Sequence, residues 1–141
     1  MTLFRKLDPD AKAPVYQTKG SAGADISALE RVEINPGETK LIRTGIAMAL
    51  PICTVGLLFP RSGLSMRTPL RQPNSVGVID ADYRGEVHGM FQNTGSETVV
   101  IEKGMRIAQL VVVPVEYETF CEVDELGETE RGEGGFGSTG V

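Results

Sequence analysis

Residues 74–93 read NSVGVIDADYRGEVHGMFQN, and their pattern predicts a hairpin: an apolar arm, a polar tip, and a second arm at 86–93. Asp80 and Asp82 are two residues apart, so in an extended arm they share one face while Tyr83 points to the other. Two such acids could bind a metal ion or supply a general base. Acids at a hairpin tip are equally what a tight turn requires, so the residues alone leave both interpretations open.

The rest of the chain repeats this pattern of short apolar segments separated by turn signals such as Asn35-Pro36-Gly37. No window keeps a helical apolar period for more than about a dozen residues, so no long helix is expected. Such spacing is typical of an all-β sandwich or barrel. The predicted strands are 3–6, 31–34, 38–44, 45–50, 54–59, 75–79, 86–93, 98–101, 106–115 and 117–123.

The composition is that of one globular domain: 141 residues, 40% hydrophobic and 23% charged. The net charge of −5 argues against broad electrostatic binding to nucleic acid. No apolar run approaches the roughly 18 residues that a membrane span needs, and the N-terminus lacks the apolar stretch of a secretion signal. We therefore expect a cytoplasmic protein without a membrane partner. Cys53 and Cys121 lie in apolar, strand-like stretches and are expected to be buried free thiols.

Two stretches carry polar groups suited to binding an anion. In FPRSGLS (59–65), Arg61 offers a fork of donors, Ser62 a hydroxyl and Gly63 a closely approachable backbone. Such a segment could be a phosphate cradle or a plain polar turn. Gln109 lies inside an apolar strand, where it must either satisfy a neighbouring backbone group or reach a ligand.

Two further features are weaker. KGSAGADIS (19–27) places small residues before Asp25 and a following strand, which is consistent with a structural loop. His88, the only histidine, has no partner visible in the sequence and is not expected to be catalytic.

The chain ends in RGEGGFGSTG, residues 131–140. From Gly127 onward, glycine is frequent and aliphatic side chains are almost absent, so this segment cannot bury enough apolar surface to offset its ordering. We therefore expect a β-barrel domain at 1–126 and a mobile tail at 127–141.

Five of these stretches, taken in order, resemble the five motifs of trimeric deoxyuridine triphosphatases (dUTPases). The resemblance implies a jelly-roll β-barrel that forms a homotrimer with its sites at subunit boundaries. It implies hydrolysis of dUTP to dUMP and pyrophosphate by water attack at the α-phosphorus, which limits uracil in DNA and supplies dUMP for thymidylate synthesis. The five stretches are AGAD (22–25), PRSGLS (60–65), NSVGVIDADYRGE (74–86), GMRIAQLV (104–111) and RGEGGFGSTG (131–140).

The same resemblance implies a role for each site residue. Asp80 matches the carboxylate that activates the attacking water, and Tyr83 matches the ring that stacks under deoxyribose and excludes a ribose. Mg²⁺ is implied as cofactor, held mainly by the triphosphate, with Asp25 acting through water or held in an internal ion pair. The implied substrate contacts are Asn74, Val78, Ile79 and the main chain of His88 at uracil, Arg61, Ser62, Gly63 and Gln109 at the phosphates, and Arg131, Phe136, Gly137 and Ser138 in a tail that closes as a lid.

The chain departs from the family pattern after Ser62, where Arg67, Pro69 and Pro73 occur and the prolines bar ordinary ladder bonding. The related dCTP deaminase is expected to carry a catalytic Glu in the hairpin region and a different third motif, so IDADYRGE favours the dUTPase. A regulatory role that contacts a partner protein, as in some phage members, stays open. Without the resemblance, the acids at 80 and 82 would suggest a glycosyltransferase-like metal site.

Overall fold

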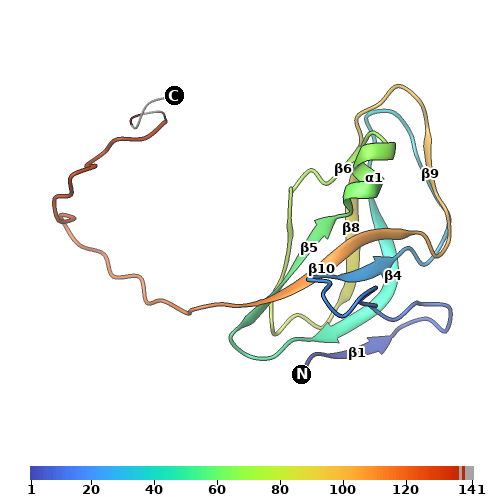
Figure 1. The fold of residues 1–141 in the computed structure, drawn as a ribbon, viewed down its shortest axis with the longest axis horizontal. Coiled ribbons are helices and arrows are strands. Elements are labelled where there is room, and N and C mark those ends of the chain that lie inside the picture. Colours follow the sequence, from blue (N-terminus) through green and yellow to red (C-terminus); the bar gives the residue numbers. More distant parts are fainter. Residues whose placement is uncertain (137, 139–141) are drawn as a thin grey trace.

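The computed structural model describes residues 1–136 and 138, and within them the fold is almost entirely β (Figure 1). The expected all-β class of jelly-roll type is therefore confirmed. In chain order the elements are β1 (Leu3–Lys6), β2 (Ala24–Ser27), β3 (Val32–Ile34), β4 (Thr39–Ala49), β5 (Thr54–Pro60), α1 (Ser62–Arg67), β6 (Leu70–Arg71), β7 (Gly77–Ile79), β8 (Glu86–Asn93), β9 (Val99–Ile101) and β10 (Arg106–Pro114).

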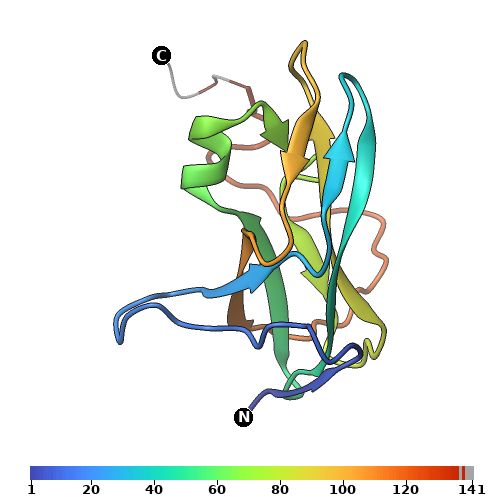
Figure 2. The same ribbon diagram turned by 90° about the vertical axis from the view of Figure 1, so that its right-hand side faces the viewer.

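The strands form two four-stranded antiparallel sheets, in the orders β1-β4-β8-β6 and β2-β10-β5-β7, and a ribbon of β3 and β9. Turned by 90°, the molecule shows these layers facing each other (Figure 2). Ile42 and Phe91 from the first sheet join Leu58 and Leu110 from the second in one apolar core. The strand orders are those of open sheets rather than a closed barrel within the described part of the chain.

Strand β4 replaces the two strands predicted at 38–44 and 45–50. It continues through both segments, and its register with β8 shifts between Arg43 and Ala47. Gly45 lies at the shift with φ +68°, a conformation that favours glycine. The irregularity is a β-bulge, so the apolar pattern breaks at this point although the strand does not end.

The two arms of the predicted 74–93 hairpin do not pair with each other. β7 pairs with β5, through Val78 opposite Leu57, while β8 pairs with β4 and β6. The turn between the arms therefore connects one sheet to the other. The two arms were predicted to pair with each other, and this prediction is wrong. Each arm instead pairs with strands that are distant in the sequence.

A short helix and a two-residue strand fill the segment after β5. In α1, Leu64 is buried, and Arg71 Nη1 donates to the carbonyls of Ser65 and Thr68 at 3.1 and 2.9 Å, near the helix C-terminus. Pro69 and Pro73 flank β6, which explains why its ladder with β8 is limited to two residues. Among the described residues, no helix is long and apolar enough to cross a membrane.

The segment after β10 runs away from the sheets (Figure 1). The predicted strand at 117–123 is wrong: in the described structure this segment is exposed, runs away from the sheets and forms no strand (Figure 1). The prediction of buried thiols is also wrong, since Cys53 and Cys121 are both exposed in this chain. Cys53 lies in the turn before β5 with φ +61°, and Cys121 lies in the segment beyond β10.

Candidate active site

A cavity of about 300 Å³ opens where β7 and β8 diverge into different sheets. Six of the predicted site residues line it: Asn74, Val78, Ile79, Asp80, Tyr83 and His88. The structure therefore brings the predicted base, sugar and water-activating residues together. Sequence reasoning gave no role to the other lining residues, which are Leu41, Leu58, Gln72, Gly77, Glu86, Val87 and Met90.

Strand β7 is the last strand of its sheet, so one row of its backbone N–H and C=O groups is unpaired by any other described strand. Val78, in the middle of β7, is 66% exposed. An edge strand beside a cavity can offer these backbone groups to the edge of a planar heterocycle, as it would to a further strand.

The turn between the arms fixes Tyr83. The Tyr83 N–H donates to the Asp80 carbonyl at 3.1 Å, and its hydroxyl donates to the Glu86 carbonyl at 3.0 Å. The ring lies against Gly85, where a Cβ would overlap the ring, so position 85 has no room for a side chain. Within residues 1–136 and 138, the Asp80 carboxylate makes no hydrogen bond or ion pair. It is exposed at the cavity and available to a water molecule.

Glu86 is a second carboxylate in the same cavity, and its environment is different. Gly45 N and Thr44 N donate to Oε1 at 2.7 and 3.1 Å, and Arg43 Nε donates to Oε2 at 3.2 Å. Burial acts to raise the pKa of Glu86, but the hydrogen bond from Gly45 and the guanidinium of Arg43 outweigh it and hold the pKa below its ordinary value of 4.5. The Glu86 side chain is therefore a carboxylate anion at neutral pH.

The sequence carried a signal for Glu86 that was missed. In β8 the residues alternate between half-buried and buried, so Glu86, His88 and Met90 share a face. All three line the cavity. His88 was already predicted to lie at the base-binding site. Because side chains two residues apart in a strand share a face, the same reasoning would have predicted Glu86 there as well.

The predicted phosphate-binding residues lie in a second pocket of about 230 Å³. Arg61, Ser62 and Gln109 line it together with Asp25, while Gly63, in α1, does not. Gln109 Nε2 donates to the Pro60 carbonyl at 3.4 Å, so this amide satisfies a neighbouring backbone group in the structure.

Asp25 holds the second pocket together. Its Oδ1 is 2.9 Å from Arg61 Nε and its Oδ2 is 3.0 Å from Arg106 Nη1. Arg61 Nη1 also donates to the Arg106 carbonyl at 3.3 Å. Of the two roles expected for Asp25, the structure contains the internal ion pair, with both carboxylate oxygens occupied. Arg106 was not singled out from the sequence.

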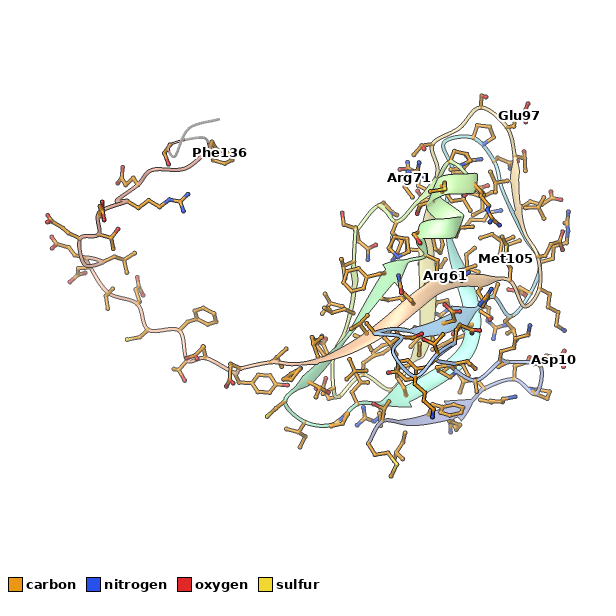
Figure 3. All side chains as sticks on the ribbon, viewed as in Figure 1. Asp10, Arg61, Arg71, Glu97, Met105 and Phe136 are labelled. Carbon is orange, nitrogen blue, oxygen red and sulfur yellow. The ribbon has the colours of Figure 1, made fainter. Side chains whose placement is uncertain are left out.

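The two pockets share no lining residue. The tail joins neither of them in this chain: Phe136 is fully exposed, and Figure 3 places it far from Arg61. Arg131 Nε donates to the Gly134 carbonyl at 2.8 Å, within the tail. Ser138 N–H donates to the Gly135 carbonyl at 3.0 Å, and Gly137 lies outside the described residues.

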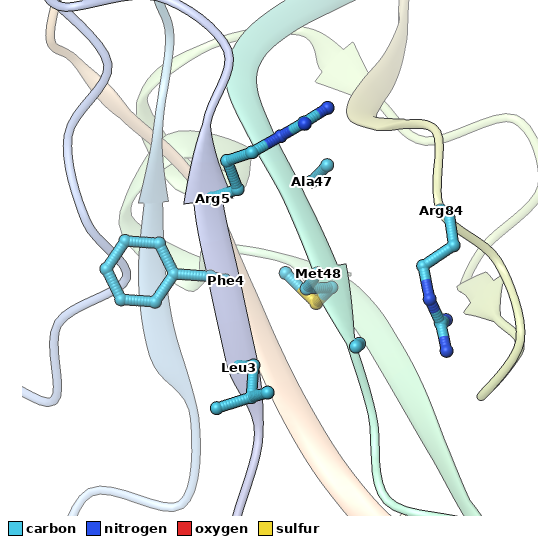
Figure 4. Close-up of a pocket in the computed structure, with 7 residues that line it drawn as sticks. Leu3, Phe4, Arg5, Ala47, Met48 and Arg84 are labelled. Atoms are coloured by element: carbon cyan, nitrogen blue, oxygen red, sulfur yellow. The ribbon is translucent and has the colours of Figure 1, made fainter.

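A third groove, of about 330 Å³, lies elsewhere, between β1, β4 and the 80–86 turn (Figure 4). Leu3, Phe4, Ala47 and Met48 give it apolar walls, and Arg84 faces it from the turn. None of the predicted site residues lines it, so we do not place chemistry there.

The described residues contain no cluster of three or more His, Cys, Asp or Glu that could hold a metal ion. Asp25 has both carboxylate oxygens engaged by guanidinium groups, so any contact with a cation would run through the cation's water shell. A Mg²⁺ ion bound mainly by phosphate oxygens and water needs no more than this from the protein.

Together these features define a class: a jelly-roll β protein with a cavity beside an edge strand and a second pocket that contains Arg61, here called the arginine pocket, an arrangement suited to a nucleotide-binding protein. A family model described as dUTPase matches residues 9–140. The chain belongs to the dUTPase family.

Individual relatives agree with this assignment. The chain is 51% identical over 142 residues to the deoxyuridine 5'-triphosphate nucleotidohydrolase of Corynebacterium diphtheriae, covering 100% of this chain and 93% of the relative. It resembles the dUTPase of Staphylococcus bacteriophage 80alpha in complex with dUpNHpp, with a TM-score of 0.94, 34% identity and coverage of 100% and 99%. It also resembles a mutant dUTPase of S. aureus phage phi11 described as coordinating a structural Mg(II) ion, with a TM-score of 0.85, 29% identity and coverage of 91% and 99%.

Proposed function

We propose that this chain is a dUTP diphosphatase, which hydrolyses dUTP to dUMP and pyrophosphate. Membership of the dUTPase family supports the reaction. The observation that supports the site is the cavity between β7 and β8, where an unpaired carboxylate, a fixed aromatic ring and an unpaired strand edge meet.

Base recognition uses the edge of β7. The backbone at Val78 and Ile79, with the side chain of Asn74, pairs with the polar edge of uracil, and the main chain at His88 completes the pocket. A site that hydrogen-bonds its ligand rejects analogues with a mismatched donor pattern by roughly 10⁴-fold or more, because buried polar groups are otherwise left unpaired. Cytosine is rejected because its donor pattern does not match the site. Thymine is rejected because its 5-methyl group does not fit.

Tyr83 supports the sugar. Its hydroxyl end is fixed by the hydrogen bond to the Glu86 carbonyl and lies close to Gly85. A ring fixed in this way can stack under deoxyribose and leave no room for a 2′-hydroxyl.

Asp80 carries the chemistry. Its free carboxylate orients a water molecule and accepts a proton from it as the water oxygen attacks the α-phosphorus. The bond from the α-phosphorus to the bridging oxygen breaks, and pyrophosphate leaves. A positioned general base of this kind contributes about 10²- to 10⁴-fold to the rate.

The phosphates bind in the second pocket, which Arg61, Ser62 and Gln109 line, and the backbone of Gly63, the next residue of α1, approaches them from beside it. Because the two pockets share no residue in one chain, we propose that the site forms between chains, in a homotrimer. The base cavity of one subunit then faces the arginine pocket of the next.

Mg²⁺ bound to the triphosphate oxygens would neutralise charge there, and Asp25 would act through the position of Arg61 and the ion's water shell. The tail from residue 127 is a lid: Phe136 stacks on the base, and Arg131, Gly137 and Ser138 contact the phosphates. Closure of the lid excludes bulk water from the reaction.

The test is pyrophosphate release in the presence of Mg²⁺ from dUTP, dTTP, dCTP and UTP, measured side by side. Release from dUTP alone is expected. Ammonia release from dCTP would instead indicate the related deaminase, and binding of dUTP without turnover would indicate a nucleotide sensor.

A further inference from the structure

Glu86 joins two structural features that are otherwise separate: the bulge in β4 and the aromatic rings of the cavity. Its side chain is only 13% exposed. The Glu86 carboxylate accepts hydrogen bonds from the β4 bulge, and the Glu86 backbone carbonyl contacts the side chains of Tyr83 and His88.

The bulge forms a receptor for the carboxylate. Because the register shifts here, the N–H groups of Thr44 and Gly45 leave the ladder and converge on Glu86 Oε1, at 3.1 and 2.7 Å. Gly45 must be glycine for this backbone, since φ is +68° and a Cβ would lie 2.8 Å from that of Ala11. Arg43 Nε donates to Oε2 at 3.2 Å, so both carboxylate oxygens are occupied.

The Glu86 carbonyl holds two cavity side chains. The Tyr83 hydroxyl donates to it at 3.0 Å. His88 Nδ1 lies 2.9 Å from the same oxygen, and because a carbonyl can only accept, Nδ1 carries the hydrogen. Tyr83 and His88 both line the cavity. The position of one carbonyl therefore sets the orientation of two rings.

We propose that Glu86 is a positioning residue that fixes the nucleotide pocket: its carboxylate anchors residue 86 to the β4 bulge, so that its carbonyl holds the Tyr83 ring where it discriminates deoxyribose from ribose. This inference rests on the proposed function, because it assigns Tyr83 to the sugar. Glu86 is not a second base, because its oxygens already accept three hydrogen bonds while those of Asp80 are free.

The experiment measures kcat/KM for dUTP and for UTP in the wild type, Glu86→Ala and Glu86→Gln. Alanine removes the anchor, and the dUTP:UTP ratio is expected to fall by roughly ten- to a hundredfold, since misplacement by about 1 Å can cost that much. Glutamine keeps an oxygen that Gly45 and Thr44 can bond, so its ratio is expected to lie closer to that of the wild type.

Glu38 supplies a matched control. Its carboxylate also accepts from a backbone N–H, that of Asn35 at 2.9 Å, and pairs with Lys40 at 3.2 Å, but it does not line the cavity. Glu38→Ala is expected to change stability without changing the dUTP:UTP ratio. If Glu86→Ala shifts the ratio no more than Glu38→Ala does, Glu86 is only structural and the inference is overturned.

A second variant tests the same link without touching Glu86. Tyr83→Phe removes the hydroxyl that bonds the Glu86 carbonyl and should lower the ratio in the same direction. In the double variant with Glu86→Ala the two losses should not add, because both remove one connection. If the wild type hydrolyses dUTP, either of two results would overturn the inference: an unchanged dUTP:UTP ratio in Tyr83→Phe, or losses in that ratio that simply add in the double variant. A wild type that does not hydrolyse dUTP would overturn the proposed function and this inference with it.

Discussion

Asp80 and Asp82 lie two residues apart in the turn after β7, yet of the two only Asp80 is among the described residues that line the base cavity. The turn is closed by Arg84, whose Nη1 donates to the carbonyls of Ala81 and Tyr83 at 2.7 and 2.9 Å. This conformation separates two acids that the sequence pattern placed on one face.

The pair gives a direct test of the catalytic base. Asp80→Asn should retain dUTP binding but lose about 10²- to 10⁴-fold in kcat, because asparagine cannot accept the proton. Asp82→Asn, its matched control, should keep nearly the wild-type rate. Kinetics combined with calorimetric binding of a non-hydrolysable dUTP analogue would measure both effects. A near-normal rate in Asp80→Asn would remove Asp80 from the mechanism.

The side-chain oxygen of Gln72 is buried and accepts no hydrogen bond from the described residues. The Gln72 side-chain nitrogen donates to the Leu58 carbonyl at a long 3.3 Å, and its Oε1 is the one buried side-chain nitrogen or oxygen atom of the described residues that lacks a hydrogen-bond partner. An unpaired buried polar group costs about 1–3 kcal/mol, which is comparable to or larger than the hydrogen bond it accompanies. Gln72→Leu should therefore leave the free energy of unfolding unchanged or raise it by about 1 kcal/mol. Urea denaturation would measure this, and a clear loss of stability would show that the bond to Leu58 dominates.

Glu86 should make stability depend on pH in the acid range. Its pKa in the folded protein is lower than its ordinary value of 4.5, so the unfolded state binds the proton more tightly. The stabilisation is present above pH 4.5 and is lost as the pH falls through the folded pKa. The stability difference between wild type and Glu86→Gln should therefore shrink from pH 7 to acid pH. A difference that stays constant across that range would contradict the assignment.

Truncation after Glu130 should separate folding from catalysis. The last buried residue of the apolar core is Leu110, Val112 packs against that core, and the described residues beyond Pro114 are almost all exposed. The melting temperature should change little, while kcat/KM for dUTP falls by about 10²-fold or more as the lid is lost. An unfolded product would mean that the tail supports the fold.

The sequence predicted most strands because β-branched runs and turn residues act locally. It could not predict that β7 and β8 enter different sheets, since strand partners are chosen by contacts distant in sequence. Two strands, 38–44 and 45–50, were predicted in place of β4, because the bulge at Gly45 interrupts the alternation of apolar and polar residues without ending the strand. The exposure of Cys121 escaped prediction for a related reason: an apolar segment has a strand's pattern even where it does not lie against a sheet edge of its own chain.

The site was predictable to the extent that motifs specify it. Residues of the 74–86 stretch do converge on one cavity, and Arg61, Ser62 and Gln109 converge on another. The connections that hold these residues in place, from Arg106 to Asp25 and from the β4 bulge to Glu86, join segments far apart in sequence and leave no local pattern.

In the proposed trimer, one active site combines the base cavity of one chain with the arginine pocket of another. Asp80→Asn and Arg61→Gln chains, each carrying a different affinity tag and each nearly inactive alone, would be co-expressed, and oligomers that carry both tags would be assayed for pyrophosphate release from dUTP. In a mixed cyclic trimer roughly one site in three regains both residues, so up to about a third of wild-type activity per oligomer is expected. Activity no higher than that of either variant alone would show that Asp80 and Arg61 serve the site from the same chain, and would rule out a site shared between chains.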